Sequence, residues 1–204
     1  MRQRVVIARV AAFAVLVVGA APSRAAAPAS GAEPVIRKTV DDAFAVLKDK
    51  SLAGKERRAQ RLAALRRIAD RVFDWAEMAR SSLGAGWRNL DARQRSVFVD
   101  VFKDVLAAEY MDDIDRFRGT ETVTVDGSTA QGEDTVVKTT LVTFSRDRVP
   151  IDYRMRSEQG EWKVVDLSIE GVSLVNHFRK TFSNALANMT IDQLIDRLKR
   201  QLPK

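Results

Sequence analysis

The chain of 204 residues contains no cysteine and only one histidine, His177. Without cysteine there is no disulfide bond and no thiol chemistry, so the core alone must stabilise the fold. His177 lies four residues after Ser173, a spacing that shares one helix face, but the residues around Ser173 are not the Gly-x-Ser-x-Gly of a hydrolase. We therefore predict that the protein is not an enzyme and has no catalytic residue, no cofactor and no metal site.

The N-terminal region lacks the roughly 20 uninterrupted apolar residues that a membrane-spanning helix requires. Its apolar run, residues 10–20, follows three arginines and leads into small residues that end in Ser-Arg-Ala. This pattern is typical of a secretory signal peptide, and a retained membrane anchor is the alternative. We expect cleavage after Ala25, with Ala21 or Ala27 as alternative sites. The predicted parts are a signal peptide at 1–25, a flexible linker at 26–33 and a single domain at 34–202.

The predicted mature chain also lacks a strong excess of one charge. Residues 1–25 hold four arginines and no acidic residue, so cleavage lowers the formal net charge from +7 to +3. This balance is ordinary for an exported protein and predicts no binding to nucleic acid. A local basic cluster remains, which either docks on anionic lipid or acidic partner surfaces or is a solvated helix face. Its members are Lys55, Arg57, Arg58, Arg61, Arg66, Arg67 and Arg71.

Apolar residues recur every three or four positions in six segments, which is the spacing of helices with one buried face. Pro34 suits the first turn of the first helix, which we expect to end near Lys50. Asp91 stands three residues before Gln94, a capping-box spacing, and the apolar stripe of this longest helix continues to Phe117. The other predicted helices cover residues 62–73, 75–83, 173–187 and 190–201.

The period changes at Gly119, and four segments rich in Val, Thr, Ile and aromatic residues follow. In the third segment Ile151, Tyr153 and Met155 alternate with charged residues, which predicts one buried face and one wet face. Helices, then a meander of strands, then helices indicate an α+β fold in which helices cover a curved, four-stranded antiparallel sheet. The predicted strands cover residues 120–126, 134–144, 149–156 and 161–169, with Asp126-Gly127 as the first turn.

The run from Trp162 to Val175 predicts a strand that turns at Glu170-Gly171 directly into a helix. We expect Gly171 to adopt a backbone angle that other residues resist, and Ser173 to cap the helix with its hydroxyl. Further motifs precede this run in a fixed order: Phe73, Leu83-Gly84-x-x-Trp87, Gln94-Arg95-x-x-Phe98, Phe102, Tyr110 and Ile151-x-Tyr153. Each motif alone is weak, but the ordered set resembles the MlaC family of periplasmic phospholipid-binding proteins.

The resemblance covers nearly the whole predicted mature chain and implies a lipid carrier. Such a carrier is a periplasmic shuttle that moves one diacyl phospholipid between an outer-membrane lipoprotein complex and an inner-membrane ABC transporter. It holds the lipid tails in an apolar slot between sheet and helices and needs no tight headgroup site. A monomer is the simplest state for a protein that must engage two membrane complexes in turn.

The physical chemistry of lipid tails is consistent with this function. Two acyl chains hold on the order of 30 methylene groups, and at about 0.8 kcal/mol each their exposure to water would cost more than about 20 kcal/mol. Crossing an aqueous space therefore requires an enclosed apolar slot, and the alternative is that the same residues only fill a core. The expected lipid-binding residues are Phe98, Val101, Phe102, Val105, Ile151, Tyr153, Met155, Val164, Phe178 and Phe182.

Three other functions compete with a phospholipid carrier. The first is a carrier of a polycyclic lipid such as a hopanoid, which a branch of the same family handles. The second is a small enzyme that acts on apolar substrates, for which Asp166 is the candidate titratable group. The third is an adaptor that holds partners through the basic cluster and carries no lipid.

Overall fold

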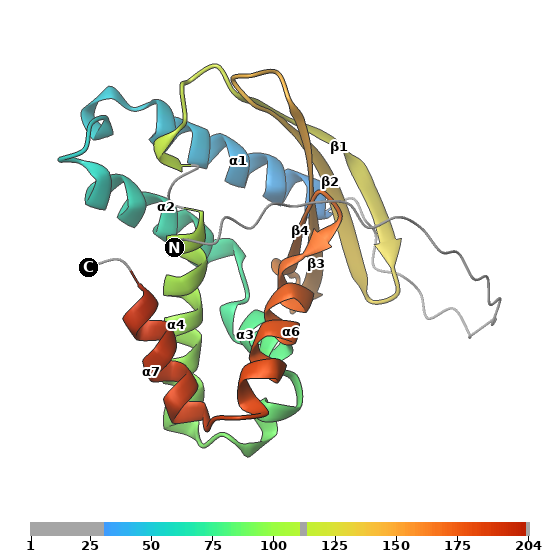
Figure 1. Cartoon of the computed structure of the whole chain (residues 1–204). Coiled ribbons are helices and arrows are strands. Elements are labelled where there is room, and N and C mark those ends of the chain that lie inside the picture. The colour runs from blue at the N-terminus through green and yellow to red at the C-terminus, as the bar shows by residue number, and fades with distance from the viewer. Residues whose placement is uncertain (1–30, 111–113, 203–204) are drawn as a thin grey trace.

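The computed structural model describes residues 31–110 and 114–202, and it places two groups of helices around a curved antiparallel sheet (Figure 1). The expected signal peptide and its cleavage sites lie outside these residues. Within the described part of the chain, no helix combines the length and apolar character needed to cross a membrane. The α+β architecture predicted from the sequence is confirmed.

The first pair of helices lies against one face of the sheet, and the remaining helices form a separate group (Figure 1). Helix α1 (Ala32–Lys48) contacts the sheet directly, and α2 (Arg58–Val72) packs beside α1. Short 3-10 helices follow α1 and α3, at Lys50–Leu52 and Gly84–Asn89. The second group consists of α3 (Trp75–Leu83), α4 (Ala92–Glu109), α6 (Leu174–Leu186) and α7 (Ile191–Gln201).

The sheet is a five-stranded antiparallel meander in which neighbours along the chain are neighbours in space. The sequence predicted four strands, and the fifth, β5 (Val172–Ser173), has only two residues, too few for a periodic pattern. It hydrogen-bonds to the end of the preceding strand and leads directly into α6. The four long strands are β1 (Thr122–Gln131), β2 (Asp134–Val142), β3 (Arg148–Glu158) and β4 (Glu161–Ile169).

The prediction that Asp126-Gly127 forms the first turn was wrong, because β1 continues through these residues. The pairing register with β2 shifts between Val125 and Gly127, which marks a bulge, and Gly127 has a φ of 130°. The hydroxyl of Thr140 donates to the Asp126 carboxylate at 2.6 Å, so the aspartate is satisfied within the sheet. The chain instead reverses at Gly132, whose φ is 64°.

Most helix boundaries follow the predicted start and stop signals. Asp91 and Gln94 form the predicted capping box at the start of α4. The Ser173 side chain accepts a hydrogen bond from the Asn176 backbone N–H and so caps α6 as expected, and Gly171 has a φ of 78°. The long stripe predicted to reach Phe117 runs over residues 111–113, which lie outside the described residues.

Buried apolar side chains fall into two separate clusters. The first, which we term the helical core, lies among α3, α4, α6 and α7 and contains the aromatic rings of Phe98, Phe102, Phe178 and Phe182. The second, which we term the sheet core, packs Ile36 of α1 against Val137, Met155 and Val164 of the strands. The buried apolar side chains between the helices and the sheet therefore do not form one continuous core.

One polar atom in the helical region has no partner, which leads to a stability prediction. Ser82 of α3 is completely buried, and its hydroxyl has no hydrogen-bond partner among the described residues. Because an unsatisfied buried hydroxyl is destabilising, Ser82→Ala should raise the free energy of unfolding by about 1 kcal/mol. Urea denaturation would measure the change. Ser81→Ala is the matched control and should not stabilise, because the Ser81 hydroxyl donates to Glu77 at 2.9 Å.

Candidate binding cavity

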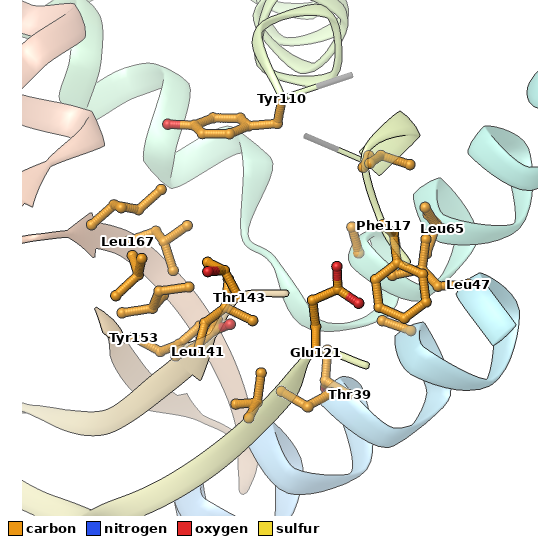
Figure 2. A pocket seen from close by; sticks show the side chains of 18 of the residues that line it. Thr39, Leu47, Leu65, Tyr110, Phe117, Glu121, Leu141, Thr143, Tyr153 and Leu167 are labelled. Carbon is orange, nitrogen blue, oxygen red and sulfur yellow. The ribbon is translucent and has the colours of Figure 1, made fainter. Parts of the chain in front are cut away.

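A cavity of about 860 Å³ lies between the two groups of apolar side chains. It is bounded by α1 and α2, by the inner face of the sheet, by residues 109–110 and 114–121, and by the start of α6 (Figure 2). Its volume lies in the upper part of the roughly 300–1,000 Å³ range of ligand pockets. The space is therefore large enough for a sizeable ligand and does not result from a single missing side chain.

The helical wall of the cavity follows from the spacing of apolar residues on α1 and α2. Val40, Ala43, Phe44 and Leu47 recur at intervals of three or one along α1 and share one face. This face turns toward the cavity with Leu65, Ile68 and Ala69 of α2. Each set includes an alanine, Ala43 or Ala69, so the two helices do not fill the space in front of the sheet.

The opposite wall is built from rows of side chains that cross the strands. Because alternate residues of a strand share a face, cross-strand partners on the inner face form continuous apolar rows. One row pairs Ile151 with Ile169, and the next pairs Tyr153 with Leu167. A further row joins Val123, Leu141 and Val149 from three successive strands.

The structure separates the ten residues that the sequence predicted as lipid-binding into two groups. Ile151, Tyr153 and Phe178 line the cavity. The other seven do not line it: Phe98, Val101, Phe102, Val105 and Phe182 belong to the helical core, and Met155 and Val164 belong to the sheet core. The reason is the direction of α4, whose apolar stripe packs on α3 and α7 and on the aromatic rings of α6 and not on the strands.

The sequence prediction of lipid-binding residues included none from α1 or α2, although the sequence pattern of these helices contained a signal for this wall of the cavity. Val40, Ala43 and Phe44 were visible as one apolar face, but a helical stripe does not reveal whether another element covers it. Phe117 and Phe144 also line the cavity, and both lie outside the helices and strands of the structure, although the sequence predicted a helix through Phe117 and a strand through Phe144. Their position depends on how the chain folds between α4 and β1 and between β2 and β3.

Glu121 is a buried carboxylate in the cavity wall. The residue Glu121 is only 7% exposed, and the Arg118 backbone N–H donates to its two carboxylate oxygens at 2.9 and 3.1 Å. Burial opposes ionisation of Glu121, but the surrounding backbone N–H groups of residues 118–121 hold its pKa below the ordinary value. The backbone N–H groups of the turn thus stabilise the charge, and Glu121 is labelled among the cavity residues in Figure 2.

Tyr153 of β3 lines the sheet side of the cavity. Burial raises the pKa of Tyr153 to about 12. A shift of this direction and cause is expected for a hydroxyl surrounded by apolar groups, because the phenolate would be poorly solvated there. The neighbouring side chains of Ile151, Leu167 and Ile169 make the sheet side of the cavity apolar.

Asp166, the candidate group for an enzyme, does not line the cavity. Its carboxylate accepts hydrogen bonds from the Ser173 hydroxyl at 2.6 Å, the Leu167 N–H at 2.8 Å and the Val175 N–H at 3.1 Å. A guanidinium nitrogen of Arg154 lies 3.7 Å away. These contacts give Asp166 a structural role at the junction of β4 and α6. His177 lines the cavity but is exposed to solvent.

The basic cluster of α2 is largely engaged in ion pairs within the protein. Arg58 and Arg61 both contact Asp115, at 2.7 and 2.9 Å. Arg66 pairs with Asp104 at 2.8 Å, and Arg71 pairs with Asp42 at 3.2 Å. These arginines connect α2 to α1, to α4 and to the segment that follows α4, so the cluster carries less uncompensated charge than the sequence alone indicates.

Comparison with protein families decides the membership of the chain. Residues 37–200 match the family described as MlaC protein, which is most of the chain. The chain belongs to the MlaC family. The resemblance seen in the sequence motifs is therefore confirmed, and the match includes both groups of helices and the whole sheet of this MlaC protein.

A solved structure with the same fold supports the architecture. The chain is similar to a phospholipid-binding protein from Ralstonia solanacearum, whose structure contains a phospholipid, with 24% sequence identity and a TM-score of 0.72. The likeness covers 83% of this MlaC chain and 95% of the Ralstonia chain. A search of the curated proteins found no match.

The buried carboxylate of Glu121 leads to a pH prediction. The folded state lowers the pKa of Glu121 below its ordinary value of 4.5, so its contribution to stability is present above about pH 4.5 and is lost as the pH falls through the lower folded value. Glu121→Gln should lower the unfolding free energy near neutral pH by about 1 kcal/mol and weaken the loss of stability on acidification. Urea denaturation over a pH series would measure both effects.

The exposed Glu133, in the turn between β1 and β2, provides the control for this prediction. Glu133→Gln should keep the acid dependence of the unmodified protein. An unchanged acid dependence in Glu121→Gln would show that the turn at residues 118–121 does not depend on this carboxylate.

Proposed function

We propose that this MlaC protein is a phospholipid carrier that holds the two acyl chains of one lipid in the cavity between α1, α2 and the sheet. The observation that carries the proposal is a cavity of about 860 Å³ with predominantly apolar walls in a chain of this family. Transfer of two acyl chains out of water is favourable by more than about 20 kcal/mol, and an apolar cavity of this size removes much of their surface from water. The phospholipid in the related Ralstonia structure supports the same assignment.

The placement of polar groups gives the lipid an orientation in this proposal. Apolar side chains of the sheet rows form one wall, and the tails lie along it. Thr143, Ser145, Glu170 and His177 lie at the end of the cavity where the β2–β3 and β4–β5 turns approach solvent. The headgroup remains at this mouth, where water solvates the phosphate, so no dedicated headgroup site is needed.

The cellular role follows from the family and from the N-terminal sequence. In this proposal the protein is exported by the signal peptide at residues 1–25 and acts in the periplasm as a monomer. There it exchanges lipid with an inner-membrane ABC transporter complex and an outer-membrane lipoprotein complex. The family assignment favours binding and transport over catalysis, and the position of Asp166 away from the cavity removes the candidate group for a pocket enzyme.

Lipid recovery from the purified protein tests the proposal. The mature protein, purified without detergent, should release close to one phospholipid per chain on organic extraction, with the mass of a diacyl lipid. Recovery of a polycyclic lipid in a similar amount would instead support the hopanoid alternative, because the two kinds of cargo differ in mass. A well-folded protein without lipid would contradict a carrier function altogether.

A substitution that fills the cavity tests where the lipid lies. Ala69 faces the cavity from α2, so Ala69→Trp should displace one or both chains and lower the recovered lipid several-fold while the protein stays folded. Ala63 lies on the exposed side of the same helix and does not line the cavity. Ala63→Trp should therefore retain the lipid. Equal lipid recovery from both variants would place the cargo elsewhere; circular dichroism would confirm that both variants fold.

A further inference from the structure

We propose that the mouth of the cavity docks directly on the surface of an anionic lipid bilayer, through an apolar and basic rim formed by Arg118, Phe144, Arg146 and Val172. This proposal rests on the carrier function proposed above and specifies its membrane step. It begins from an unusual distribution of exposed apolar side chains. Among the described residues, the large hydrophobic side chains that are strongly exposed are Phe144, at 54%, and Val172, at 44%.

Both exposed side chains also line the cavity, so they lie where it opens. Phe144 lies in the β2–β3 turn and Val172 in β5. The end of β4 lies beside the start of β3, where the Glu170 N–H donates to the Pro150 carbonyl at 2.9 Å, so the β2–β3 and β4–β5 turns are at the same end of the sheet. An apolar surface that continues from the outside into the cavity gives a lipid tail a path that avoids water. Exposed apolar groups that follow such a path indicate an interaction site and are not scattered surface residues.

The turn that carries Phe144 is ordered by its own hydrogen bonds. The Thr143 N–H donates to the Asp147 carbonyl at 3.0 Å, and the Arg146 N–H donates to the Thr143 carbonyl at 3.0 Å. The Ser145 hydroxyl donates to the Asp147 carboxylate. Phe144 is therefore held outward by a defined turn, so little conformational entropy is lost when its ring enters another phase.

Charge at the rim favours an anionic lipid surface over an uncharged apolar partner. The guanidinium of Arg118 lies 5.9 Å from the centre of the Phe144 ring, which combines a cation and an aromatic ring in one contact. Arg146, two residues after Phe144, is exposed. The nearby acidic residues are Asp147, whose carboxylate accepts from Ser145, Glu170, and the buried Glu121, whose carboxylate accepts from the Arg118 backbone N–H. An aromatic ring beside guanidinium groups suits the level of the phosphates, where the ring enters the interface and the cations meet lipid phosphate.

Flotation with protein-free vesicles tests this inference. The mature protein should bind vesicles of equimolar phosphatidylcholine and phosphatidylglycerol more tightly than vesicles of phosphatidylcholine alone, and the difference should shrink as salt is added. Phe144→Asp should weaken the partition onto anionic vesicles at least about tenfold, because ring burial is lost and a negative charge is added. Val172→Asp should act in the same direction at an independent position.

Two further variants separate charge from position. Arg146 has a φ of 71°, which asparagine tolerates, so Arg146→Asn removes the charge without straining the turn. This variant should weaken vesicle binding about fivefold and keep its co-purified lipid, because Arg146 does not line the cavity. Ala130→Asp adds the same charge as Phe144→Asp at the opposite end of the sheet, in the exposed end of β1, and should bind like the unmodified protein.

The outcomes distinguish this inference from the carrier function. Absence of lipid in the purified protein would overturn the carrier function, and with it the membrane step. A lipid-loaded protein that does not bind anionic vesicles, or a Phe144→Asp variant that binds as well as the unmodified protein, would overturn only the membrane docking. The rim would then face a protein partner.

Discussion

The carboxylate of Asp166 holds the sheet and the helical core together, and the cavity depends on this junction. Asp166 stands near the end of β4 and binds the Ser173 hydroxyl and the Val175 N–H, so it satisfies the first turn of α6 from the side of the sheet. A carboxylate at this position also interacts favourably with the positive end of the helix dipole. The direction in which α6 leaves the sheet is therefore set by a specific polar contact.

The direction of α6 determines which space between the helices and the sheet stays unfilled. Phe178 and Phe182 of α6 pack against Phe102 of α4, with ring centroids 5.4 and 6.4 Å apart. This aromatic contact commits the apolar stripe of α4 to the helical core. A second junction, at Phe73 and Asp74, fastens the chain between α2 and α3 to Val164 of β4. The walls are thus joined at their edges, and the space between them is left unfilled.

The sequence predicted the elements well because each depends on local chemistry. The cap residues Asp91 and Ser173 and the glycine at 171 are recognisable from neighbours within three residues. The bulge at Gly127 was misread because a glycine after an aspartate is typical of a turn, whereas here the pairing with β2 continues across it. The two-residue β5 has no pattern of its own and exists only because β4 is beside it.

The location of the cavity required information that local patterns do not contain. An apolar stripe on a helix shows that one face avoids water, and it does not show whether the covering surface is protein or ligand. The stripes of α1 and α4 look alike in the sequence, yet α4 is covered by aromatic rings while Val40 and Phe44 face the cavity. The difference comes from the long-range junctions at Asp166 and Phe73, which cannot be inferred from helical spacing.

The ion pairs of α2 give the cavity wall a different kind of attachment from the rest of the fold. Arg58 and Arg61 reach Asp115 across the edge of the cavity, and both partners are partly exposed to solvent. Such pairs contribute little each and are weakened by salt, whereas the aromatic contacts of the helical core are not. The sheet core, by contrast, attaches α1 to the strands through the apolar packing of Ile36 on Val137 and Met155. Salt therefore weakens the contact of α2 with the segment after α4 and leaves the attachment of α1 to the sheet in place.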